Sequence, residues 1–185
     1  MEKTLTFIAL FAGLVAALGF IPKIMLASGV PITAQSLGVM LCGTVLGAKR
    51  GGLAVLLFLL LVAIGLPLLA GGRGGLGVFV SPSAGFLYGW PVAAFVTGSI
   101  VEKWGGNTLT VVATVASVIG CIVVMYIPGI TWLAINLEKS LIEATLIAAF
   151  YIPGDIIKAI IAGLITGALA RTRPASLLSR SRSTL

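Results

Sequence analysis

The chain has 185 residues, of which 59% are hydrophobic and only 9% are charged. Soluble domains carry about a quarter charged residues, so this composition excludes an ordinary soluble domain and indicates a polytopic helical membrane protein. The net charge of +7 collects in short loops and a basic tail, which favours membrane orientation over nucleic-acid binding. Both cysteines lie in apolar stretches, where buried free thiols are more common than a disulfide.

The sequence contains no histidine. This excludes imidazole metal ligands and the Ser–His and Cys–His catalytic pairs. Paired carboxylates, which acid–base hydrolysis uses, are missing as well. We therefore predict that the chain is not an enzyme, with no catalytic residues and no metal site.

Long uncharged stretches between charged residues locate the membrane spans. Each stretch can hold a helix that crosses ~30 Å of hydrocarbon. We expect one all-α membrane domain over residues 1–185, followed at its end by a basic cytoplasmic tail at 171–185. The six transmembrane helices are expected at about 4–22, 32–48, 51–67, 82–101, 108–127 and 153–170.

Lysine and arginine residues predict the orientation. Six spans put both termini on one side of the membrane, and eight cations would lie there against four elsewhere. The positive-inside rule then predicts cytoplasmic N- and C-termini. The eight are Lys3, Lys49, Arg50, Lys103, Arg171, Arg173, Arg180 and Arg182, and the four are Lys23, Arg73, Lys139 and Lys158.

Residues 131–150 do not fit this pattern, because Glu138, Lys139 and Glu143 lie in the middle of the segment. Three charges at the centre of a bilayer would be costly. We expect an amphipathic helix on the outer surface near 131–150. The alternative is a seventh span, which would put the basic tail outside and violate the charge bias.

A glycine-rich stretch at Leu69–Ser81 contains a G-x-G-x-x-G match at residues 72–77. A dinucleotide site needs this motif between a strand and a helix, and here it follows a membrane span. There is also no phosphate-binding loop for ATP in the sequence. We interpret the stretch as an outer loop that folds over a binding site, in which Arg73 suits a carboxylate.

Asp155 and Lys158 give the sharpest sign of a site. They lie three residues apart and therefore share one face of the last span. Ionisable groups within a membrane are expensive and usually functional. We predict that both bind ligand, although a mutual structural ion pair is the alternative.

Other polar and aromatic residues are weaker candidates. The amide of Gln35 both donates and accepts hydrogen bonds, which suits a neutral polar ring, but it could equally join two helices. Tyr88, Trp90 and Trp132 could line a pocket or form an interfacial belt.

Three stretches resemble the BioY family, the biotin-specific substrate-binding (S) components of energy-coupling factor (ECF) transporters. The matching stretches are GVPITAQSLGVMLCGTVLGAKRG at 29–51, GLPLLAGGRGGLGVFVSPSAGFLYGW at 65–90 and IPGDIIKA at 152–159. The central stretch is the most specific, and the resemblance runs over about residues 4–170.

The resemblance implies a multi-pass protein of the bacterial inner (cytoplasmic) membrane that takes part in vitamin uptake. It implies that biotin is captured at the outer face and delivered inward with a membrane coupling (T) protein and ATPase subunits. The chain itself would then need no cofactor, because the partner subunits use the ATP. The family's polar pocket residues would map onto Asp155, Lys158, Arg73 and Gln35, and Ala12 and Ala16 would dock the coupling protein. We add Tyr88 as a substrate-binding residue because its aromatic ring could line the pocket.

The sequence leaves two points open. Biotin has a carboxylate and a ureido ring, and the residues do not decide whether Arg73 or Lys158 meets the carboxylate. The alternative function is a self-contained secondary transporter of a small carboxylate. Asp155 is the one acid embedded in a predicted span, and this scarcity argues against coupling to protons or cations.

Overall fold

The computed structural model describes residues 2–25, 31–104 and 108–180. It is helical apart from a two-residue antiparallel pair, β1 with β2, which the all-α expectation did not include. The elements are α1 (Glu2–Leu18), β1 (Ile24–Met25), β2 (Pro31–Ile32), α2 (Gln35–Leu46), α3 (Ala48–Ala63), η1 (Leu76–Val80), α4 (Ala84–Lys103), α5 (Leu109–Val118), η2 (Ile119–Val124), α6 (Met125–Asn136), α7 (Leu141–Ala149), α8 (Ile152–Thr172) and η3 (Pro174–Ser176).

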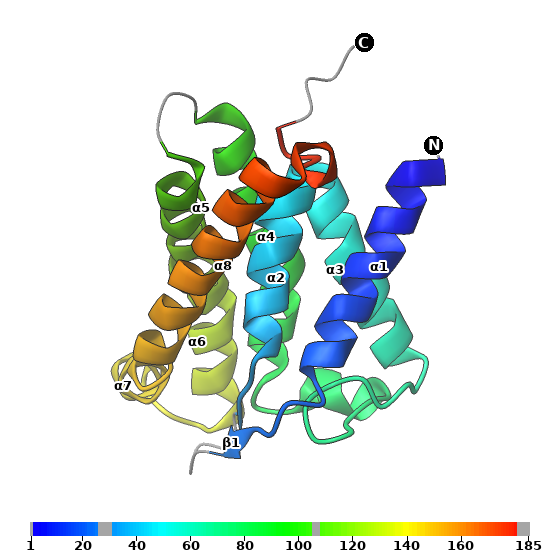
Figure 1. The fold of residues 1–185 in the computed structure, drawn as a ribbon. Helices are drawn as coiled ribbons and strands as arrows, with labels where there is room; N and C mark the ends of the chain where they lie inside the picture. The colour runs from blue at the N-terminus through cyan, green and yellow to red at the C-terminus, as the bar shows by residue number, and fades with distance from the viewer. Residues whose placement is uncertain (1, 26–30, 105–107, 181–185) are drawn as a thin grey trace.

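The helices form a bundle in which both chain ends lie at the same end (Figure 1). The opposite end carries β1, the loop between α3 and α4, and α7 (Figure 1). We call the first the terminal end and the second the loop end. The bundle therefore has two chemically different ends, and the candidate site lies at the loop end.

Three of the described helical stretches are long and apolar enough to cross a membrane, namely Ala84–Lys103, Leu109–Asn136 and Ile152–Thr172. The second joins α5, the π-helix η2 and α6 without a break. Others are shorter than the predicted spans: α1 ends at Leu18, and α2 covers 12 residues. Apolar side chains such as Leu60 and Leu164 are exposed on the outside of the bundle, where lipid would cover them.

Gly47 separates α2 from α3. Its φ of 86° lies in the left-handed region, which glycine adopts without strain. Gly98 of α4 packs directly against Gly47, and a side-chain carbon at Gly98 would collide with that backbone. Glycine at both positions therefore lets α4 pack closely where the chain reverses from α2 into α3.

The single amphipathic helix expected near 131–150 is wrong in its bounds. α6 continues to Asn136, and α7 begins at Leu141 after a turn in which Glu138 has φ 52°. The break has a local cause, because Ser140 and Glu143 form a capping box that starts a new helix. The charged residues thus lie in a turn and a helix start rather than along one continuous face.

Candidate functional site

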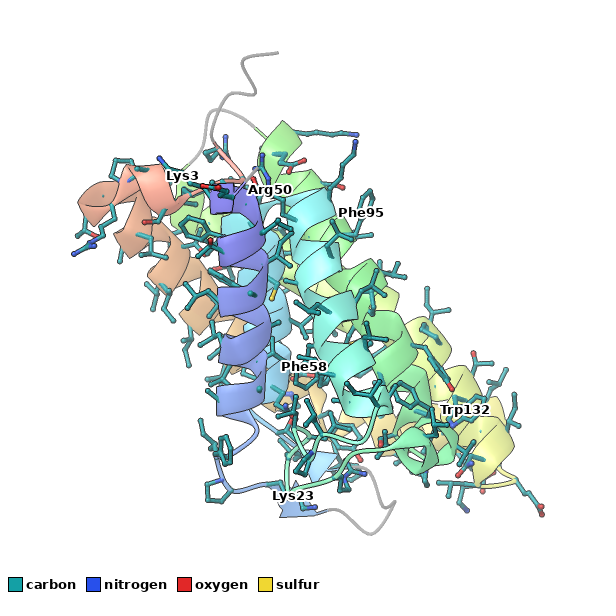
Figure 2. The ribbon with its side chains drawn as sticks, turned by 90° about the vertical axis from the view of Figure 1, so that its right-hand side faces the viewer. Lys3, Lys23, Arg50, Phe58, Phe95 and Trp132 are labelled. Carbon is teal, nitrogen blue, oxygen red and sulfur yellow. The ribbon has the colours of Figure 1, made fainter. Side chains whose placement is uncertain are left out.

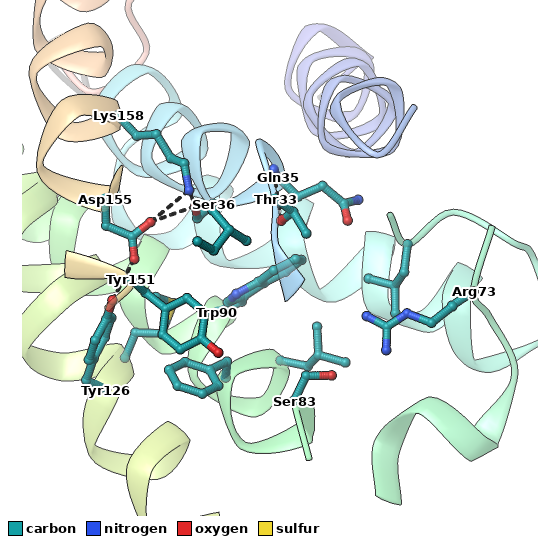
Figure 3. Close-up of a pocket in the computed structure, with 15 residues that line it drawn as sticks. Thr33, Gln35, Ser36, Arg73, Ser83, Trp90, Tyr126, Tyr151, Asp155 and Lys158 are labelled. Carbon is teal, nitrogen blue, oxygen red and sulfur yellow. Dashed lines mark hydrogen bonds and ion pairs between the residues drawn. The ribbon is translucent and has the colours of Figure 1, made fainter. Parts of the chain in front are cut away.

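A cavity opens at the loop end of the bundle, with about 580 Å³ of space including its mouth. Segments far apart in the sequence line it: β2, the start of α2, the glycine-rich loop, α4, α6 and α8 (Figure 3). The lining residues are Ile32, Thr33, Gln35, Ser36, Leu69, Arg73, Ser83, Phe86, Leu87, Trp90, Met125, Tyr126, Tyr151, Asp155 and Lys158.

One end of the cavity holds a connected polar group that we call the Asp155 cluster (Ser36, Tyr126, Asp155 and Lys158). Lys158 Nζ lies 2.9 Å from Asp155 Oδ1 and donates to Ser36 Oγ at 3.0 Å. Ser36 donates to the same Oδ1 at 3.1 Å, and Tyr126 donates to Oδ2 at 2.8 Å (Figure 3). A buried charge pair needs such additional hydrogen bonds to offset its desolvation. The carboxylate is therefore fixed in direction, and the cluster is nearly neutral overall.

The sequence alone did not point to Ser36 or Tyr126 as parts of the site. Tyr126 precedes Asp155 by 29 residues and Ser36 precedes it by 119, so neither pair has a local spacing signal. Ser36 is brought there by the packing of α2 against α8, and Tyr126 by the reach of its side chain from α6. By contrast, the spacing of Asp155 and Lys158 was visible in the sequence because both lie on α8.

Gln35 lines the cavity, but its amide is occupied by main-chain partners. Its Nε2 donates to Val15 O and Leu68 O, each at 3.0 Å, and its Oε1 accepts from Ala70 N at 2.9 Å. These bonds join the end of α1 to the loop after α3. Gln35 therefore positions the loop: both N–H donors of its amide are used by main-chain oxygens, and its Oε1 accepts one main-chain bond.

Arg73 lies at the opposite side of the cavity from the Asp155 cluster (Figure 3). It belongs to a glycine hairpin, residues 66–75, which Leu69 and Arg73 close through two main-chain hydrogen bonds of 2.9 and 3.2 Å. Gly71 and Gly72, with φ of 80° and 69°, make the turn. The hairpin thus holds Arg73 over the cavity.

The Arg73 side chain lacks a partner for one of its donors. Its Nε is buried, and no acceptor among the described residues bonds to it. Burial lowers the pKa of the Arg73 guanidinium from its ordinary value. An arginine remains charged even so, and a buried donor without an acceptor costs free energy. This end of the cavity is therefore suited to an anion.

Aromatic and apolar side chains separate the two polar ends. Phe86 packs edge-on against Tyr126 at 5.5 Å between ring centroids, and Trp90 packs against Phe58 at 6.0 Å. Trp90 and Phe86 are both buried. The middle of the cavity is thus a preformed apolar wall with a polar group at each end.

Tyr88, a predicted substrate-binding residue, does not line the cavity. Its hydroxyl donates to Phe79 O at 2.6 Å, and its ring packs edge-on against Trp132. Trp132 in turn donates to Ser81 O at 2.9 Å. Tyr88 and Trp132 therefore fix the loop before α4 from outside the cavity, whereas Trp90 lines the cavity.

A model of the BioY family matches residues 2–175. The chain belongs to the BioY family. The "Biotin transporter BioY" of Rhodobacter capsulatus is 53% identical, with 97% of this chain and 100% of that protein covered. The "Probable biotin transporter BioY" of Bacillus subtilis is 43% identical over 85% of each chain.

A solved structure is also similar, the "S-component for biotin from an ECF-type ABC transporter". It has a TM-score of 0.86 and 32% identity, and 92% of each chain is covered. The helical bundle is thus the architecture of a membrane transport protein of the BioY family.

The α1 surface differs from the one expected for a BioY protein. Ala12 is 3% exposed and packs in the core, and Ala16 is half-buried. The exposed small residues of α1 are Ala9, Gly13 and Ala17, four residues apart on the outer face. In the isolated chain Ala12 thus shares the inward face of α1 with Val15, and its role in docking a partner stays a prediction.

Proposed function

We propose that this chain captures biotin at the outer face of the bacterial cytoplasmic membrane, as the S component of an ECF transporter. The observation that supports the proposal is the cavity itself. It has an arginine suited to an anion at one end, the hydrogen-bonded Asp155 cluster at the other, and aromatic rings between. Biotin has the matching order of groups, with a carboxylate, an apolar chain and bicycle, and a ureido ring. Membership of the BioY family and the names of the relatives support this ligand.

We assign the carboxylate of biotin to Arg73. Lys158 already lies 2.9 Å from Asp155 and donates to Ser36, so most of its charge is satisfied within the protein. The buried Nε of Arg73 has no acceptor among the described residues. A charge-assisted bond to the carboxylate would satisfy this donor. The ureido ring then meets the Asp155 cluster, where Asp155 can accept from its N–H groups and Lys158 can donate to its oxygen.

The proposed topology has six spans with both termini in the cytoplasm. The charge asymmetry supports it, since six spans would put eight of the twelve cations on the side of the membrane that holds both termini. This orientation directs the cavity outward, where biotin arrives. α7, which lies at the loop end in Figure 1, would then rest at the outer surface.

The chain carries no ATP-binding motif of the phosphate-loop type, so ATP-driven transport would need partner subunits. We propose that a membrane coupling protein docks against α1 and that ATPase subunits supply the energy. The exposed residues Ala9, Gly13 and Ala17 allow another helix to approach α1 closely. The membrane-embedded Asp155 is paired with Lys158, which argues against a proton-coupled transporter working alone.

Titration calorimetry of the detergent-purified chain with biotin and with biotin methyl ester tests the proposal. We expect one saturable site for biotin and weaker binding of the ester by roughly ten- to a hundredfold, because a charged hydrogen bond contributes about 1.5–3 kcal/mol. Absence of biotin binding would refute the function, and equal affinities would refute the assignment of the carboxylate to Arg73. Biotin accumulation in proteoliposomes driven by an ion gradient would favour the secondary transporter.

A further inference from the structure

A second cavity lies at the terminal end of the bundle, far from the biotin site along the helices. It forms where α2 ends and α3 begins, beside the end of α4 and the C-terminal tail, and has about 1370 Å³ of space including its open side. Its lining residues are Leu46, Ala48, Lys49, Arg50, Phe95, Ser99, Glu102, Lys103, Leu178, Ser179 and Arg180. Arg50 and Phe95 are labelled near this end in Figure 2.

Four cations line this cavity against one carboxylate. The cations are Lys49, Arg50, Lys103 and Arg180, and the acid is Glu102. Glu102 Oε1 accepts from Ala48 N at 2.9 Å, so this carboxylate is engaged with the start of α3. The cavity therefore has an excess of positive charge that no described acid neutralises.

Main-chain bonds hold the two guanidinium groups in place. Arg50 donates to Leu178 O at 3.1 Å, and Arg180 donates to Trp104 O at 2.7 Å. The tail that carries Arg180 is itself fixed, because Ser179 donates from N to Val45 O at 2.9 Å and from Oγ to Thr44 O at 2.6 Å. These carbonyls end α2, so the tail satisfies acceptors that the helix leaves open. The arginine side chains that line the cavity are thus held in fixed positions.

An apolar groove along α4 adjoins the basic cavity. Phe95, Val96, Ile100 and Trp104 line the groove, and Phe95, Ser99 and Lys103 line both the groove and the cavity. Phe95 is 46% exposed and Trp104 is 38% exposed, on the outside of the bundle. A basic cavity therefore continues directly into a surface that hydrocarbon would cover.

We propose that this composite site binds an anionic phospholipid, with its phosphate headgroup among the four cations and an acyl chain along α4. The inference depends on the proposed topology only for the leaflet, which would be the cytoplasmic one. Basic pockets at that side of membrane proteins are suited to anionic headgroups. The adjoining groove favours a lipid over a soluble phosphate, because a soluble ion would leave the apolar half of the site empty.

Native mass spectrometry of the detergent-purified chain tests the proposal. Phosphatidylglycerol is compared with phosphatidylcholine of the same acyl chains, and inorganic phosphate is added as a competitor. The test variant is Lys49→Gln/Lys103→Gln, which spares both arginine bonds to the main chain. The matched control is Arg171→Gln/Arg173→Gln, which removes two exposed cations that do not line the cavity.

We expect retention of phosphatidylglycerol over phosphatidylcholine, and a loss of about tenfold in that retention for the test variant, with no loss for the control. Val96→Trp, which fills the groove and leaves the charges, should also weaken phosphatidylglycerol binding. Thermal unfolding of the same preparations without biotin should be unchanged, which shows that each variant folds and keeps this result independent of the biotin proposal.

Three outcomes would overturn the lipid site. Equal retention of the two lipids would remove the role of charge, and equal losses in the test and control variants would remove the role of this cavity. Displacement of the lipid by inorganic phosphate would identify a soluble anion as the occupant.

Discussion

At one end of the loop-end cavity the Asp155 cluster satisfies its own hydrogen bonds, whereas at the other end Arg73 has a buried Nε with no acceptor among the described residues. The cluster lies on helices that pack in the bundle, and Arg73 lies on a glycine hairpin outside it. A satisfied, rigid group can select a ligand by the direction of its hydrogen bonds. An unsatisfied cation on a hairpin gains most when an anion arrives, so this end contributes to affinity through charge.

Lys158→Met should have the largest effect on biotin binding. Removing one member of a buried ion pair strands the other, here Asp155, which is 5% exposed, and costs about 3–5 kcal/mol. We expect a loss of affinity of about a hundredfold or more by calorimetry. Lys139→Met, at an exposed lysine in the turn before α7, is the matched control and should bind as the unaltered chain does.

The Asp155 cluster should also respond as a unit. Asp155→Asn is expected to weaken binding by roughly ten- to a hundredfold, since a charged acceptor becomes a neutral amide. The double variant with Lys158→Met should lose less than the sum of the two single effects, because each change already breaks the shared network. Wild-type affinity in properly folded single variants would mean that the pair is structural.

Arg73→Gln should come next, with a loss of roughly ten- to a hundredfold for biotin. The distinguishing result lies in the ester: biotin methyl ester should bind the variant as well as it binds the unaltered chain. Arg171→Gln, on the exposed end of α8, serves as the control for loss of a cation. An equal loss for acid and ester would place Arg73 against the ureido ring and reverse the comparison between the two ends.

Gln35→Met removes two bonds to the glycine hairpin, at Leu68 O and Ala70 N, and one to α1, at Val15 O. Because Gln35 acts through the position of Arg73, we expect a smaller loss for biotin, about tenfold, and little for the methyl ester. The variant combined with Arg73→Gln should bind no worse than Arg73→Gln alone. A loss for the ester as well would mean that the Gln35 amide contacts the ligand directly.

Some residues of the cavity could be predicted from the sequence and others could not, for physical reasons. Asp155 and Lys158 were recognisable because both lie on one helix face and a charge within a span is rare. Arg73 was recognisable from the glycines around it. Ser36 and Tyr126 were not, because an interhelical hydrogen bond leaves no mark in local spacing.

Helix boundaries and the orientation of side chains show the same difference between features that local sequence reveals and features that only packing determines. The Ser140–Glu143 capping box was present in the sequence and could have divided the 131–150 segment. The assignment of Ala12 to a docking face depended on the rotation of α1 about its axis, which only its packing against α2 and α3 determines. Tyr88 was misassigned for a similar reason, since aromatic residues line pockets and loops alike.

Tyr126→Phe should produce a smaller loss still. It removes one hydrogen bond to Asp155 Oδ2 and keeps the ring that packs against Phe86. Since the bond joins a neutral donor to a charged acceptor, we expect a loss of about five- to tenfold in biotin affinity. Phe79→Leu near Tyr88, outside the cavity, is the control for an altered aromatic residue. An unchanged affinity would show that Lys158 and Ser36 orient the carboxylate unaided.

The smallest effect on biotin should come from Gly13→Trp, on the exposed face of α1. Nothing lies within 4 Å of a side-chain carbon built at Gly13, so the ring can extend outward into lipid or detergent. Biotin affinity should change by less than about twofold, because α1 reaches the cavity only through Val15 O, on its other face. Assembly with the coupling protein, measured by co-purification, should be lost. Ala12→Trp is the contrasting variant: a large ring at a buried position overpacks the core, and we expect it to lower the thermal stability of the isolated chain. If Gly13→Trp assembles normally and Ala12→Trp is stable yet does not, then Ala12 docks the partner after all, and α1 must rotate when the complex forms.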